Sequence, residues 1–67
     1  MDYRYLVLNM ENEEEECNVF RNLRLLSSYV NDMYSIQKSH MYYHRKLTNN
    51  NPLYLDKLLI LKFIIEV

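Results

Sequence analysis

The sequence predicts a mainly α-helical protein with two or three helices and a short N-terminal strand or arm. Three observations support this: apolar residues at helical spacing in the middle of the chain, charges there that match a helix dipole, and a very apolar C-terminal segment. We expect helices at about 12–34, 36–47 and 52–66. Together they would form a single small domain over residues 1–67.

The central stretch carries the clearest periodicity. Its apolar residues alternate in steps of four and three, which places them on one stripe of a helix: Val19, Leu23, Leu26, Val30 and Met33. This pattern indicates an amphipathic helix whose apolar side packs against another element.

The ends of this stretch also favour a helix. The run from Glu13 to Glu16 would stand near the N-terminus, where the helix dipole favours negative charge, and Asn12 is a suitable N-cap. The segment 31–39 is rich in serine, asparagine and tyrosine, which are mediocre helix formers, so we expect a break or kink there.

The two ends of the chain leave an alternative open. Residues 3–9 read as a short strand, because aromatic and β-branched residues favour that state. Asn51-Pro52 suits the start of a helix over 52–66, which would be apolar on most sides. The alternative is an α+β fold in which strand 3–9 pairs with a strand over 60–67.

The amino-acid composition indicates the kind of genome and the cellular compartment of the protein. Glycine, alanine and tryptophan are absent while asparagine, tyrosine, isoleucine and lysine abound, a bias that suggests an AT-rich genome such as that of a virus or an intracellular parasite. Cys17 is the sole cysteine, which favours a reducing, intracellular (cytoplasmic) compartment over a secreted disulfide scaffold. We expect no signal peptide, because the N-terminus opens with Asp2 and Arg4 and then has only a brief apolar run. We expect no membrane span, because the apolar tail is too short and too charged.

Enzymatic activity is not expected from this sequence. It contains no catalytic motif and no family signature, and a chain this small has little room for a preorganised pocket. His40 and His44 have the spacing of half a metal site, but no further cysteine or histidine lies nearby. We therefore expect no metal, no cofactor and no small-molecule substrate.

The abundance of apolar residues favours a protein–protein interaction. About half the residues are hydrophobic, more than two or three short helices can bury among themselves. The leading hypothesis is a small non-enzymatic accessory subunit that docks through apolar helical faces, on a larger assembly or on itself. Its predicted interface residues are Leu23, Leu26, Val30, Leu55, Leu58, Leu59, Phe63 and Ile65.

The alternative is a ribosome- or RNA-associated small protein. Basic residues interleaved with tyrosines can bind phosphates and stack on single-stranded bases. The predicted contacts are Arg21, Arg24, Lys38, Arg45, Lys46, Tyr42 and Tyr43. Net charge near zero weakens this hypothesis, because nucleic-acid binders are usually basic.

Overall fold

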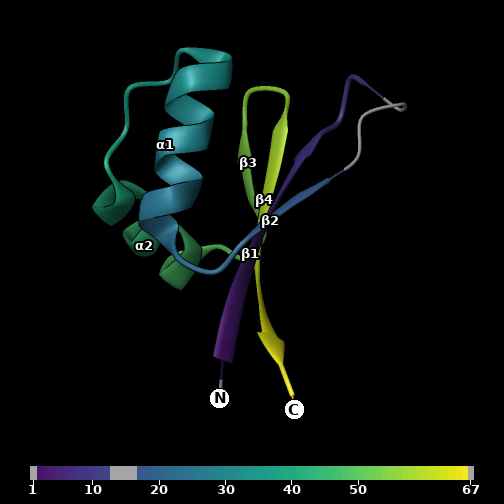
Figure 1. Ribbon diagram of the computed structural model, residues 1–67, viewed down its shortest axis with the longest axis vertical. Helices are drawn as coiled ribbons and strands as arrows, with labels where there is room; N and C mark the ends of the chain where they lie inside the picture. Colours follow the sequence, from purple (N-terminus) through teal and green to yellow (C-terminus); the bar gives the residue numbers. More distant parts are fainter. Residues whose placement is uncertain (1, 13–16, 67) are drawn as a thin grey trace.

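The computed structural model describes residues 2–12 and 17–66, and it has an α+β fold. Along the chain, the elements are β1 (Asp2–Asn9), β2 (Asn18–Phe20), α1 (Leu23–Tyr34), α2 (His40–Asn49), β3 (Leu53–Leu55) and β4 (Leu58–Ile65). The four strands form one antiparallel sheet in the order β2-β1-β4-β3. Both helices lie on the same side of this sheet (Figure 1).

The pairing of β1 with β4 forms the centre of the sheet. All eight residues of β1 are in register with β4, from Asp2 opposite Ile65 to Asn9 opposite Leu58. The two outer strands are only three residues long, so they cover part of each central strand. The sheet is therefore two long strands from opposite ends of the chain with a short strand on either side.

The core lies between the sheet and the two helices. The helices contribute Leu26 and Val30 from α1 and Tyr43 and Leu47 from α2, while the sheet contributes a matching layer of apolar residues. That layer consists of Val7, Leu53, Leu58 and Ile60. Burial of these large side chains supplies the main favourable term in the folding of the chain.

Local side-chain hydrogen bonds fix the start of α1 and the link that follows it. The Asn22 Oδ1 atom accepts from the Leu25 backbone N–H at 2.9 Å, which makes Asn22 the N-cap of α1. Helix α1 ends at Tyr34, and its C-cap Ser35 adopts a left-handed φ of 55°. The Asn31 side chain then bonds to the backbone of Lys38 and holds the link to α2.

The prediction of a mainly α-helical fold is wrong. The largest error is the expected helix 52–66, which is the β3–β4 hairpin. Asp56 makes its tight turn with a positive φ of 54°, a conformation that aspartate tolerates better than most residues. Asn51-Pro52 is a cis peptide before β3 and not a helix start. The apolar run was ambiguous because β4 is apolar on both faces, which hides the alternation typical of a strand.

The α+β alternative, with 3–9 paired to the C-terminal segment, is the arrangement observed, although β4 begins at Leu58. The expected helix 12–34 is also too long, because residues 18–20 form β2 and the helix starts at Leu23. The expected helix 36–47 corresponds to α2. The break predicted within residues 31–39 is observed at residues 35–39, between the two helices. The prediction that Asn12 is a helix N-cap is wrong, because α1 begins at Leu23. Residues Glu13 to Glu16, which we expected near the start of this helix, lie outside the described residues.

Neither helix in the described part of the chain is long and apolar enough to cross a membrane.

Candidate functional site

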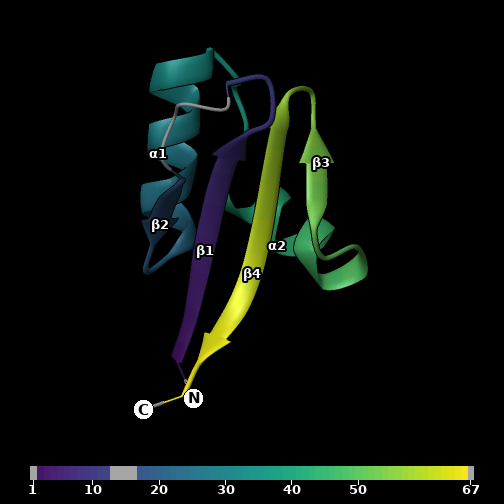
Figure 2. The same ribbon diagram turned by 90° about the vertical axis from the view of Figure 1, so that its right-hand side faces the viewer.

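One face of the sheet carries no helix (Figure 2). Successive residues of a strand alternate between the two faces, so the residues between the core positions of β1 and β4 lie on this side. They are in register across the strands, with Leu6 opposite Leu61 and Leu8 opposite Leu59. We call this surface the uncovered face, and its apolar residues are Leu6, Leu8, Val19, Tyr54, Leu59, Leu61, Phe63 and Ile65.

The uncovered face is apolar from one edge to the other. Val19 on β2 is 52% exposed and Tyr54 on β3 is 66% exposed, while the residues between them are partly exposed. An antiparallel sheet with helices on one side usually presents polar residues to water on the other. Here the register places charged residues on this face at one end only, at Asp2 and Arg4. This departure makes the face a candidate interaction surface.

The predicted interface residues are divided between the core and the uncovered face. Leu26, Val30 and Leu58 are fully buried in the core, and Leu23 and Leu55 pack against it. Leu59, Phe63 and Ile65 lie on the uncovered face. Sequence reasoning did not include the remaining members of the face, which are Leu6, Leu8, Val19, Tyr54 and Leu61. The alternation within residues 3–9 was the signal that could have identified Leu6 and Leu8.

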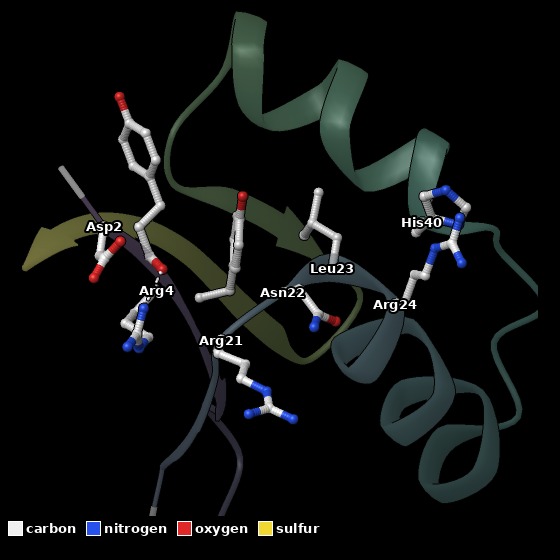
Figure 3. Close-up of a pocket in the computed structure, with 9 residues that line it drawn as sticks. Asp2, Arg4, Arg21, Asn22, Leu23, Arg24 and His40 are labelled. Atoms are coloured by element: carbon white, nitrogen blue, oxygen red, sulfur yellow. Dashed lines mark hydrogen bonds between the residues drawn. The ribbon is translucent and has the colours of Figure 1, made fainter.

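A second feature is an open hollow of about 590 Å³ beside the start of β1. It lies where the N-terminal half of β1, the β2–α1 link and the first residue of α2 approach one another (Figure 3). We call it the arginine hollow. Its lining residues are Asp2, Tyr3, Arg4, Tyr5, Arg21, Asn22, Leu23, Arg24 and His40.

The arginine hollow is rich in cationic side chains. In Figure 3, the Arg24 side chain lies beside His40, whereas Arg4 extends from β1 and Arg21 from the link between β2 and α1. Arg4 donates from Nη1 to the Tyr3 carbonyl oxygen at 2.9 Å. Among the described residues, this carbonyl is the only polar partner that the three guanidinium groups find.

The predicted RNA-contact residues do not form one surface. Arg21 and Arg24 line the arginine hollow, whereas the Nζ atoms of Lys38 and Lys46 lie 4.9 and 5.7 Å from the centre of the Tyr42 ring. Arg45 is exposed on α2. Tyr43 is buried in the core, so its ring is not available to stack on a base.

Tyr43 is a polar exception in the core. Its hydroxyl finds no hydrogen-bond partner in the described part of the chain. Burial, with a smaller contribution from nearby Tyr42, raises the pKa of Tyr43 to about 12. The hydroxyl therefore stays neutral at physiological pH.

The two histidines lie on α2, His40 partly buried and His44 exposed. Within residues 2–12 and 17–66, no three histidine, cysteine or acidic side chains are grouped so as to hold a metal ion.

Comparison with known proteins finds no matching family model, no matching curated protein and no matching solved structure.

Proposed function

We propose that this chain is a non-enzymatic protein–protein interaction module whose uncovered face packs against the same face of a second copy. The observation that carries this proposal is the continuous apolar surface on the side of the sheet without helices. Burying such a surface releases water from apolar groups and drives association. The helical residues predicted to form the interface, Leu23, Leu26 and Val30, already pack in the core. We therefore place the docking surface on the strands and not on the helices.

The size of the uncovered face suits a modest dimer. With eight apolar side chains still partly in contact with water, we estimate on the order of 500 Å² per copy, or about 1,000 Å² for the pair, near the lower limit for specific interfaces. We therefore expect a dissociation constant in the micromolar range. Two sheets packed in this way would form a sandwich with layers about 10 Å apart.

The arrangement of charges favours a second copy as the occupant. The middle of the face carries no charge, so two copies meet without burying an ionic group. Arg4 lies at one end of β1, and Glu11 follows its other end. A two-fold axis across the strands exchanges these ends and brings Arg4 of each copy towards Glu11 of the other.

The edges of the sheet favour face-to-face contact over edge-to-edge contact. Each outer strand is three residues long, so its own edge offers little backbone for another strand to pair with. Beyond β3, the Asn51 side chain bonds to both the N–H and the carbonyl of Lys62, at 3.1 and 2.8 Å. This side chain occupies backbone groups of β4 that an added strand would need.

Sedimentation equilibrium on the reduced chain tests the proposal, with Leu61→Lys as the disrupting variant. Leu61 lies at the centre of the uncovered face, so a lysine there should shift the equilibrium to monomer while circular dichroism stays unchanged. Met33→Lys is the matched control, because Met33 is 60% exposed on α1 and lies away from that face. Dimeric Leu61→Lys, or a native chain that stays monomeric at about 100 µM, would refute self-association through this face.

We further propose a reducing intracellular compartment as the setting. Cys17 is exposed and is the only cysteine, so an oxidising environment would join copies through it. Cys17→Ser should dimerise like the native chain under reducing conditions, since the proposed dimer does not use the thiol. Loss of the dimer in this variant would show that the association depends on Cys17.

A further inference from the structure

We propose that the arginine hollow binds the phosphate group of a small organic ligand about the size of a mononucleotide. The hollow lies at one end of the sheet and shares Asp2 and Arg4 with the end of the face proposed above for self-association. Its volume of about 590 Å³ falls in the range of small-molecule sites, about 300–1,000 Å³. The walls come from β1, from the segment before α1 and from the start of α2.

The charge of the hollow selects an anion. Three arginines and one aspartate line it, so the side chains sum to +2 with His40 neutral. In the described ranges, no carboxylate forms an ion pair with Arg21 or Arg24. Guanidinium groups without a carboxylate partner are suited to phosphate, because their planar fork donates two parallel hydrogen bonds to its oxygens.

The placement of Arg24 also works against the stability of the free protein. Arg24 lies in the first turn of α1, His40 is the first residue of α2, and neither helix has an acidic residue in its first turn. A helix N-terminus carries a partial positive charge and favours anions, so a cation there is unfavourable. A bound phosphate would offset both the helix ends and the arginines, which gives a reason for this unfavourable arrangement.

Two features favour a small ligand over a nucleic-acid chain. The protein has a net charge of −1, so a long polyanion would meet repulsion beyond the arginines. Tyr3 is 42% exposed at the wall, and the Lys62 Nζ atom lies 4.3 Å from the centre of its ring, so an aromatic group beside the phosphate would share this ring with a cation. A mononucleotide matches this combination of one phosphate and one ring system.

Calorimetric titration with adenosine monophosphate and with inorganic phosphate tests the proposal. Arg21→Gln and Arg24→Gln should each weaken binding of the nucleotide by about tenfold, the usual effect of losing one charged hydrogen bond. Arg45→Gln removes the same charge from exposed α2 outside the hollow and should leave binding unchanged. Unchanged binding in both hollow variants, or an equal loss in Arg45→Gln, would overturn the assignment.

The melting temperature without phosphate separates a ligand site from a merely structural one. Because Arg24 opposes the helix dipole, Arg24→Gln should raise this temperature by about 1–5 °C even though it weakens binding. A lower melting temperature would show that Arg24 stabilises the fold and would overturn the argument from unfavourable charge. A single-stranded RNA whose affinity grows with length, with no binding of the mononucleotide, would replace the small ligand by nucleic acid.

Discussion

The two faces of the sheet are built from the same strands, yet they have different surroundings. On one face, Val7, Leu58 and Ile60 are sealed by the helices and are almost completely buried. On the other, Leu6, Leu59 and their neighbours are equally apolar but remain partly exposed. Position along the sequence does not distinguish the two groups, since Leu58 and Leu59 are adjacent. The comparison shows that the apolar sequence of a strand does not by itself determine which of its residues are buried. The helices packed against one face of the sheet determine it.

The largest expected effect comes from truncating two adjacent leucines of β4. Leu58→Ala should lower the free energy of unfolding by about 2–5 kcal/mol, because it leaves a cavity between sheet and helices. Leu59→Ala should cost about 1 kcal/mol or less in the monomer, since water can fill the lost volume. Urea unfolding of dilute protein measures both.

Equal losses in these two variants would show that the faces are equally buried, and the distinction between them would fail. A chain this small has a total stability of only about 3–10 kcal/mol, so Leu58→Ala could unfold outright. Leu58→Met nearly conserves volume and should cost less than about 1.5 kcal/mol, which keeps the comparison measurable.

A second pair of variants tests polarity without changing shape. Val7 is 2% exposed on β1, and Val19 is 52% exposed on β2, on the opposite face. Threonine is nearly isosteric with valine, so Val7→Thr should cost about 1–3 kcal/mol by burying a hydroxyl. Val19→Thr should stay within about 0.5 kcal/mol.

Thermal unfolding can resolve this pair, because 1 kcal/mol corresponds to about 4–8 °C in a domain of this size. A large loss in Val19→Thr, measured at concentrations where the chain is monomeric, would mean that another part of the chain covers the uncovered face.

Part of this fold could be predicted from local patterns. Leu23, Leu26 and Val30 have the spacing of a helical stripe, and they do face the interior from α1. The position of the break between the helices followed from weak helix formers in residues 31–39. In both cases, the signal and the structure involve neighbouring residues.

The remainder depends on contacts between distant residues. The C-terminal segment forms the strand β4 because all of β1 pairs with it. The local sequence of either segment, taken alone, does not specify this pairing. The arginine hollow was missed for the same reason. Sequence proximity grouped Arg21 and Arg24 with the lysines of the following segments, whereas the fold places them with Arg4 from β1.

The smallest expected effect concerns the Tyr43 hydroxyl on the covered side of the sheet. Tyr43 is fully buried, and its hydroxyl has no partner in residues 2–12 and 17–66. Tyr43→Phe removes this unpaired group without opening a large cavity, so it should raise the free energy of unfolding by about 1 kcal/mol. Calorimetric unfolding at neutral pH measures the gain. A loss of stability would show instead that the hydroxyl has a hydrogen-bond partner in solution.

The same variant should change the response of the protein to alkali. Burial is the main cause that raises the pKa of Tyr43 from its ordinary value of 10.0 to about 12 in the folded chain. Between these values the unfolded chain releases this proton while the folded chain holds it, so stability falls as pH rises through this range. The advantage of Tyr43→Phe over the native chain should therefore widen from pH 10 to pH 12. If the two melting temperatures instead stay a constant distance apart, the hydroxyl ionises equally well in both states, and the helices do not seal the covered face from water at Tyr43.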